Sequence, residues 1–241
     1  MTGALTLYRS SIGKKAIMAL SGLVGIGFLV LHMYGNLKIF EGPEYFNTYA
    51  AGLRSLGGPI FGHTHLLWIA RFGLLAAVIL HVLMAYQLTM QDINGRPRAI
   101  RYAVKKDVQA TYASRTMRWG GVILLFFIVY HILNLTLGVV GYAPGGYRAE
   151  DAEGFHAYSN VINAFSNPFA TIFYVIAMLA LGMHLYHGFW SMFQTLGLNN
   201  YRTDRLLRIG AGAVAVILTL GFIAVPVAVL FGFVQWPEIR S

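Results

Sequence analysis

The chain of 241 residues contains no cysteine and carries little charge. The absence of cysteine excludes disulfides, thiolate zinc sites, cysteine-ligated iron–sulfur clusters and covalently attached haem. Any metal must therefore be held by histidine, by carboxylate or by a ligand that arrives with it. Only 11% of the residues are charged, whereas a soluble domain has roughly 25%. Together with a mean hydropathy of +0.60, this composition predicts an all-α integral membrane protein with one membrane domain over residues 1–241.

Acidic residues are the scarcest charged type, and all nine lie outside five long apolar runs. Each run is close to the roughly 20 residues that a helix needs to cross a hydrocarbon core. The first run is longer than the apolar core of a signal peptide and no small-residue cleavage pattern follows it, so we expect it to remain in the mature protein. The sequence therefore predicts a bundle of five transmembrane helices, at about 16–39, 67–90, 119–141, 169–194 and 208–233.

Basic residues gather on one side of the predicted membrane. The segment before the first run and the segments 91–118 and 195–208 hold thirteen Lys or Arg against three acidic residues, whereas the alternate segments hold five against six. By the positive-inside rule, the N-terminus lies in the cytoplasm and, after five crossings, the C-terminus lies outside. We therefore expect the net charge of +9 to meet anionic membrane lipid, and we expect no nucleic acid as a partner. The most basic segment, 96–118, is a connector anchored at the headgroups, a docking surface for a soluble partner, or both.

Four histidines lie inside the apolar runs, one on each of the first four. His32, His81, His131 and His184 follow one another at intervals of 49, 50 and 53 residues. Ionisable side chains in hydrocarbon are costly and mark functional sites, although a single histidine there can also be a hydrogen-bonded packing residue. One histidine on each of four successive helices is difficult to assign to packing. Because neutral imidazole is a good axial ligand for haem iron, we predict that these four side chains bind iron.

The depth of the four histidines in the membrane pairs them. His81 and His184 lie about ten residues from the cytoplasmic ends of their runs, in the inner half of the membrane. His32 and His131 lie about seventeen and thirteen residues from that boundary, toward the outer half. The sequence therefore predicts two b-type haems, an inner one held by His81 and His184 and an outer one held by His32 and His131. Because two histidines fill both axial positions, such haems transfer electrons and leave no open site for oxygen chemistry.

Three more residues are candidates for the surroundings of the haems. His187 lies three residues after His184 and competes with it for the same iron. The depth match with His81 favours His184, which leaves His187 as a neighbour of the iron ligands or a partner of a haem propionate. Ser21 is followed four residues later by glycine, a small-residue spacing that serves either ordinary helix packing or the close approach of a flat macrocycle. Arg71, at the end of its run, is a candidate partner for a propionate of the outer haem or for a quinone.

Six short motifs give the chain a resemblance to a known family along essentially its whole length. The motifs are residues 11–15 (SIGKK), 32–36 (HMYGN), 46–49 (FNTY), 113–117 (ASRTM), 129–131 (VYH) and 184–191 (HLYHGFWS). With them, the chain resembles the cytochrome b membrane anchor of succinate:quinone oxidoreductases and fumarate reductases, in the single-subunit, five-helix, dihaem form. Each motif is weak alone, and the ordered set with four spaced histidines is specific.

The resemblance implies a role in electron transport for this chain. In the family, a flavoprotein with FAD and a subunit with iron–sulfur clusters sit on the cytoplasmic face of a bacterial inner membrane. They pass electrons from succinate, through the anchor, to quinone, and succinate oxidation itself takes place on the flavoprotein. By this resemblance, His81 and His184 are ligands of the haem nearer the cytoplasm, and His32 and His131 are ligands of the outer haem.

The resemblance also implies a quinone as a substrate. Relatives with one dihaem anchor generally use menaquinone, so we expect that quinone here. Two places remain open for its site: an outer one near the haem of His32 and His131, under segment 41–66, and an inner one beside the iron–sulfur subunit, which we favour. The inner group also suits haem propionates, and it consists of Ser10, Lys14, Tyr112, Arg115 and Trp119.

One position departs from some relatives. Certain fumarate reductase anchors carry a glutamate, implicated in a transmembrane proton path, two residues before the ligand on helix four. Here that position is Gly182, and no apolar run holds an acidic residue. A proton path built on membrane carboxylates is therefore not expected.

Other functions remain open from the sequence. A fumarate reductase anchor, working in the reverse direction, would use the same parts. An independent dihaem reductase for ascorbate or ferric iron would need no succinate-oxidising partner. A histidine-lined, proton-coupled transporter would be colourless, and the missing membrane carboxylates speak against it; a purely structural anchor without haem is the last alternative. The sequence does not fix whether complexes associate into higher oligomers.

Overall fold

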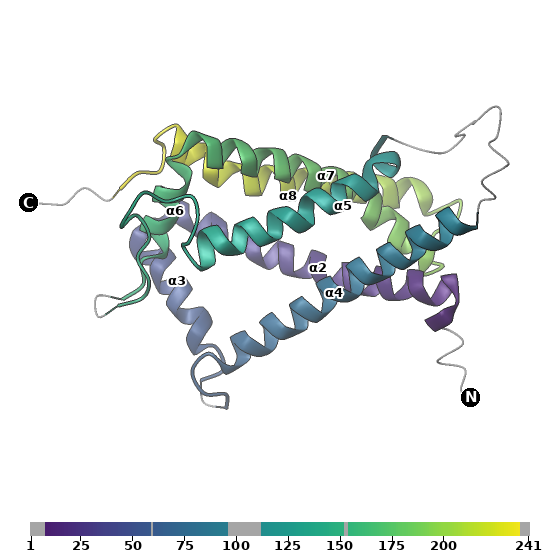
Figure 1. Cartoon of the computed structure of the whole chain (residues 1–241), viewed down its shortest axis with the longest axis horizontal. Helices are drawn as coiled ribbons and strands as arrows, with labels where there is room; N and C mark the ends of the chain where they lie inside the picture. Colours follow the sequence, from purple (N-terminus) through teal and green to yellow (C-terminus); the bar gives the residue numbers. More distant parts are fainter. Residues whose placement is uncertain (1–7, 59, 96–111, 152–153, 237–241) are drawn as a thin grey trace, which may run out of the picture.

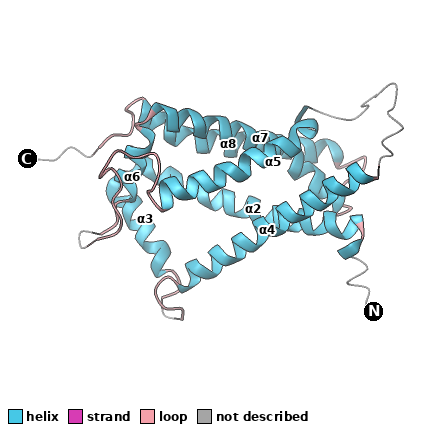
Figure 2. Ribbon diagram, in the orientation of Figure 1, coloured by secondary structure: helices cyan, strands magenta, loops and turns pink. Residues whose placement is uncertain are grey.

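The computed structural model describes residues 8–58, 60–95, 112–151 and 154–236, with only the backbone described for 112–116. Within these ranges the chain is helical, and no strand is present apart from one isolated bridge between Asp151 and Gly154 (Figure 2). The described part contains five helices long and apolar enough to cross a membrane. The prediction of an all-α, five-helix membrane protein is therefore confirmed.

The five helices alternate in direction along the long axis of the molecule (Figure 1). They are α2 (Ser11–Leu37, continued by the 3-10 helix η1, Lys38–Glu41), α4 (His65–Asn94), α5 (Tyr112–His131, continued by the π-helix η2, Ile132–Thr136), α7 (Pro168–Thr195) and α8 (Asp204–Leu230). The start of α2 and the end of α8 therefore lie at opposite ends of the bundle. The end where α2 starts is here called the inner end, and the other the outer end.

Polar residues extend several helices beyond the apolar runs. The Ser10 hydroxyl caps α2 by accepting a hydrogen bond of 3.0 Å from the Gly13 amide, which satisfies one of the free N–H groups of the first turn. Asn167 caps α7 in the same way and is followed by proline at the first helical position. At the start of α8, Asp204 accepts hydrogen bonds from Trp190, Asn199 and Arg208. Acidic residues thus enter the helices only near their ends.

The third span differs in length from its apolar run. The run extends to about residue 141, whereas the helical span ends at Thr136. Beyond it the chain turns back on itself, with Gly138 and Gly141 at positive φ, a conformation that costs glycine little. Apolar content alone did not show this reversal, because Leu137, Val139 and Val140 are as hydrophobic as the helix before them.

Two short helices cover the outer end of the bundle (Figure 1). They are α3 (Pro43–Ser55) and α6 (Ala157–Phe165). A hydrogen bond joins them, in which the Tyr158 amide donates to Asn47 Oδ1 at 3.0 Å. Most of the basic segment 96–118 lies outside the described residues.

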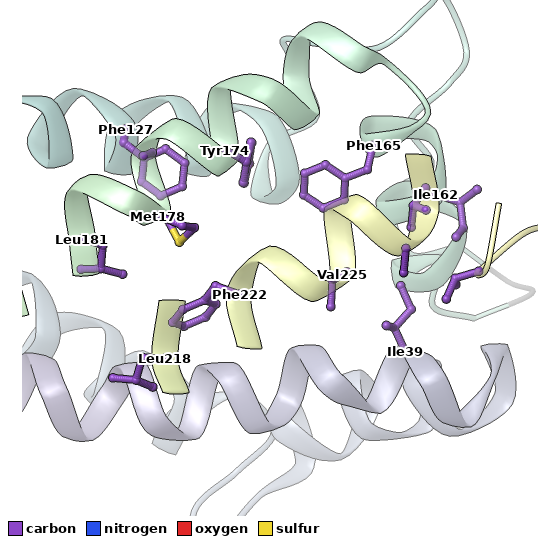
Figure 3. Packing of buried hydrophobic residues seen from close by; sticks show 14 of the residues in the cluster. Ile39, Phe127, Ile162, Phe165, Tyr174, Met178, Leu181, Leu218, Phe222 and Val225 are labelled. Atoms are coloured by element: carbon purple, nitrogen blue, oxygen red, sulfur yellow. The ribbon is translucent and has the colours of Figure 1, made fainter. Parts of the chain in front are cut away.

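The tightest packing lies between α7, α8 and α6 (Figure 3). Side chains such as Tyr174, Met178, Leu218 and Phe222 form one continuous buried cluster along these helices. In contrast, α4 buries only Ala77 and Met84 of its 30 residues. Most of its large apolar side chains are exposed, as expected for a helix whose surface meets lipid.

The close approach of α7 and α8 at Gly182 leads to a stability prediction. A Cβ atom at Gly182 would collide with the Thr219 hydroxyl, which is buried and has no hydrogen-bond partner among the described residues. Gly182→Ala should therefore cost about 1–3 kcal/mol, the usual range for overpacking. Thr219→Ala, which removes the hydroxyl, should restore much of that loss in the double variant. Thermal unfolding of the four proteins in detergent measures the coupling, and simple additivity of the two changes would contradict this packing.

Candidate functional site

The four membrane histidines lie on α2, α4, α5 and α7. These helices form two diagonal pairs in the bundle, α4 with α7 and α2 with α5. Helix α2 packs closely on α4 and α7, and α5 packs closely on α7. Within the described part of the chain, neither α4 and α7 nor α2 and α5 pack extensively. Even so, the ring of His81 on α4 contacts that of His184 on α7, and the ring of His32 on α2 contacts that of His131 on α5.

The inner pair consists of His81 on α4 and His184 on α7, with ring centroids 6.2 Å apart. Nδ1 of His81 donates to the Met18 carbonyl at 3.0 Å and lies 3.4 Å from the Ser21 hydroxyl. The hydroxyl of Ser21, which is buried, donates to the carbonyls of Ile17 and Met18. Since a carbonyl only accepts, the proton of His81 is on Nδ1 and its Nε2 keeps a free lone pair.

Two glycines allow the backbone to approach this inner pair. A Cβ atom at Gly22 on α2 would lie 3.3 Å from Cε1 of His81, tighter than ordinary contact. A Cβ atom at Gly121 on α5 would lie 3.8 Å from Cε1 of His184, an ordinary contact distance. The imidazoles therefore lie against bare stretches of backbone on both sides.

The outer pair consists of His32 on α2 and His131 on α5, with ring centroids 5.7 Å apart and the rings nearly perpendicular. His32 stacks on Phe28 at 5.1 Å and lies 5.9 Å from the ring of Phe222. Nδ1 of His131 lies 3.2 Å from the hydroxyl of Tyr174. One member of each pair thus has its Nδ1 hydrogen-bonded to the protein.

The two pairs lie at different depths in the bundle. On α2, Gly22 touches the inner pair and His32 belongs to the outer one, ten residues further on. On α7, Tyr174 touches the outer pair and His184 belongs to the inner one, again ten residues away. At 1.5 Å per residue, each helix separates the pairs by about 15 Å. Two independent helices therefore give the same spacing.

The geometry of both pairs fits the axial positions of a haem. Two imidazoles on opposite sides of one metal ion, with metal–nitrogen bonds of about 2 Å, place their ring centroids roughly 6 Å apart. The distances of 5.7 and 6.2 Å agree with this value. Nδ1 of His184 is buried without a hydrogen-bond partner among the described residues. The arrangement therefore suits a bound metal, while the role of these residues as ligands stays a prediction.

The structure separates His187 from this arrangement. Its ring lies 6.1 Å from the ring of Trp190, and in the described part of the chain it makes no ring contact with His81. His184, and not His187, therefore lies opposite His81.

Arg71 is exposed on α4, with its guanidinium 4.8 Å from the ring centroid of Trp68.

The predicted inner quinone group is only partly described. Ser10 caps α2, and Lys14 lies one turn later with 8% of its surface exposed. Trp119 on α5 is 74% exposed. The side chains of Tyr112 and Arg115 lie outside the described residues, so the structure does not assemble this group into a site.

Two polar residues of the outer site were missed by the sequence analysis. Tyr174 is buried beside His131 and donates to Oδ1 of Asn134 at 2.9 Å. Asn134 is completely buried in the π-helix η2. An amide inside an apolar run, three residues after a predicted ligand, was a signal for Asn134, since such a group needs hydrogen-bond partners in hydrocarbon.

At the outer end of the bundle, two tyrosine hydroxyls connect segments that are distant in the sequence. The hydroxyl of Tyr142 donates to the carbonyl of Asn160 at 3.2 Å, and that of Tyr158 donates to the carbonyl of Gln235 at 3.0 Å. Burial raises the pKa of Tyr142 well above its usual value, with a smaller contribution from Tyr147, and burial also raises the pKa of Tyr158. Both hydroxyls therefore remain protonated and able to donate these hydrogen bonds at physiological pH.

Comparison with known proteins identifies the family of the chain. No curated protein and no solved structure matches the chain. A family model, described as the succinate dehydrogenase/fumarate reductase transmembrane subunit, matches residues 96–222. This match includes α5, α7 and most of α8, and with them His131 and His184. Because it covers more than half of the chain, the protein belongs to the family of succinate dehydrogenase/fumarate reductase transmembrane subunits.

Proposed function

We propose that this chain is the cytochrome b anchor of a succinate:quinone oxidoreductase and carries electrons between an iron–sulfur subunit and menaquinone. Membership of the family supports the role of membrane subunit. The observation that carries the proposal is the meeting of four histidines in two pairs, about 15 Å apart along α2 and α7. A fumarate reductase anchor, with electrons moving in the opposite direction, would use the same residues.

The chain's own residues hold and orient the two haem b groups in this proposal. His81 and His184 would hold the inner haem, and His32 and His131 would hold the outer haem. When bound, these haems supply one-electron carriage across the bundle. The Met18 carbonyl fixes the orientation of the His81 ring, because a hydrogen bond at the other ring nitrogen sets the tautomer and direction of a ligating histidine. Apolar neighbours such as Phe28 and Phe222 exclude water from the outer pair.

Charge supports the orientation and the place of the partners. The inner end carries the described basic residues Arg9, Lys14, Lys15, Arg118, Arg202, Arg205 and Arg208. By the positive-inside rule this end faces the cytoplasm of a bacterial inner membrane. The iron–sulfur subunit would dock there, with the FAD-bearing flavoprotein beyond it. The inner haem would then receive electrons before the outer one.

The quinone site is proposed near the inner end, beside the iron–sulfur subunit. Lys14 supports this place, because it is a largely buried lysine near the inner end, and an ammonium group there suits a quinone oxygen or a haem propionate. The alternative site near the outer haem, under segment 41–66, would put quinone chemistry on the opposite side of the membrane. The affinity of a menaquinone analogue, measured as inhibition of the Lys14→Gln variant, separates the two sites. The analogue should bind more weakly to the variant if the site is inner, and equally well if the site is outer.

Single histidine substitutions test the assignment of the ligands. His81→Ala or His184→Ala should remove the inner haem, and His32→Ala or His131→Ala should remove the outer haem, because each deletes one of two axial bonds. Reduced-minus-oxidised absorption spectra of the purified chain, with haem content per chain, measure this loss.

His187→Ala is the matched control for these four substitutions, because it removes an imidazole one turn from His184. It should leave both haems in place. If His187→Ala removed a haem while His184→Ala did not, the assignment on α7 would be wrong.

The contact between Gly22 and His81 gives a finer test of the inner site. Gly22→Ala puts a methyl group 3.3 Å from Cε1 of His81, so the ring must shift. We expect about tenfold weaker retention of the inner haem, at the lower end of the effects seen when the surroundings of a ligand change. Gly27→Ala on the same helix is the control, because a Cβ there has open space. Equal haem retention in the two variants would contradict this contact.

A further inference from the structure

A chain of hydrogen bonds connects His131 to the outer loop. Nδ1 of His131 lies 3.2 Å from the hydroxyl of Tyr174. This hydroxyl donates to Oδ1 of Asn134 at 2.9 Å, and Nδ2 of Asn134 donates to the carbonyl of Val140 at 2.9 Å. Tyr174 and Asn134 are both buried, at 5% and 0% exposure. Because both side chains are buried, the direction of each hydrogen bond is set by the groups beside them.

The carbonyl of Val140 sets the direction of the whole chain. A carbonyl only accepts, so the amide of Asn134 must present Nδ2 to Val140 and Oδ1 to Tyr174. Oδ1 also only accepts, so the single proton of the Tyr174 hydroxyl is committed to Asn134. The Tyr174 oxygen can then only accept from His131, which places the ring proton on Nδ1. Nε2 of His131 is left with a free lone pair, the form that binds a metal.

The local fold holds these groups in place. Asn134 belongs to the π-helix η2, which starts directly after His131; a π turn within an α-helix frequently marks a functional site. The loop then turns back at Gly141, whose φ is +81° and whose Cβ would lie 2.6 Å from Nδ2 of Asn134. Only glycine therefore lets the loop bring the Val140 carbonyl to the amide.

Aromatic rings fix the phenol from the other sides. The ring of Tyr174 lies 5.0 Å from Phe127 and 4.8 Å from Phe165, with both contacts edge to face. Such packing leaves the hydroxyl little freedom to move away from His131.

We propose that Tyr174 and Asn134 are positioning residues, which fix the tautomer and orientation of His131 and lower the midpoint potential of the outer haem. The inference rests on the proposed function, since it assumes a haem at the outer pair. A hydrogen bond accepted from Nδ1 makes the opposite nitrogen more basic, and a more basic ligand stabilises ferric over ferrous iron. At the inner site the nearer partner of His81 Nδ1 is the backbone carbonyl of Met18, at 3.0 Å, with the Ser21 hydroxyl at 3.4 Å. At the outer site the partner of His131 is a side chain, which a substitution can remove.

Tyr174→Phe tests the proposal, because it deletes the acceptor and keeps the ring in the core. In the full chain, the midpoint potential of the outer haem should become more positive, while that of the inner haem stays unchanged. Transfer of the outer haem to apomyoglobin should become about ten- to hundredfold more favourable. Redox titration with separate spectral components for the two haems measures the first effect, and competition with apomyoglobin measures the second.

Tyr130→Phe is the matched control. Tyr130 precedes His131 and packs at 6.0 Å from the ring of Tyr174, and no hydrogen bond of its hydroxyl is found in the described part of the chain. If Tyr174→Phe and Tyr130→Phe gave the same outer potential and the same haem transfer, the proposal would be overturned.

Asn134→Ala is a second test, which covers the case in which Tyr174→Phe does not assemble. It frees the proton of Tyr174 and should move the outer potential in the same direction by a smaller amount; an unchanged potential would contradict the proposal. The proposed function fails separately, if the unmodified chain lacks the outer haem. With both haems present and neither variant different from Tyr130→Phe, only the role of Tyr174 and Asn134 fails.

Discussion

Imidazole nitrogen in a hydrocarbon environment is the constraint on which this structure depends. Each such nitrogen needs a partner, because the lipid around the helices provides none. Among the four membrane histidines, the protein supplies a partner to one ring nitrogen of His81 and one of His131. It then brings these rings to within about 6 Å of His184 and His32 on the opposite helices. This arrangement leaves ring nitrogens available in the space between diagonal helices, where an iron atom would satisfy them.

Packing in the bundle follows from the same requirement. Helices α7 and α8 bury a continuous apolar cluster with α6 (Figure 3). Helix α4 buries few side chains and is held mainly by α2. In a membrane, apolar burial contributes little to helix association, so cofactor ligation between α4 and α7 would add an attachment that packing does not provide. The family to which the chain belongs matches it across α5, α7 and most of α8.

Much of this arrangement was predictable from the sequence, because a membrane reduces the number of possible folds. Hydropathy predicted five spans, and counting residues from the charged ends paired His81 with His184 and His32 with His131. The hydrogen bonds around the histidines were not predictable. The hydrogen bonds that join Tyr174, Asn134 and Val140 depend on a π turn after His131 and on a loop reversal at Gly141. Neither feature leaves a periodic pattern in the sequence. The third span was predicted too long because the reversing segment after Thr136 is itself apolar.

The haem content of the purified chain tests the central claim most directly. The full chain, produced with ample haem supply, should give two haem b per polypeptide in a pyridine haemochrome assay, with low-spin spectra typical of bis-histidine ligation. One haem per chain, no haem, or a high-spin spectrum with an open axial position would contradict the account.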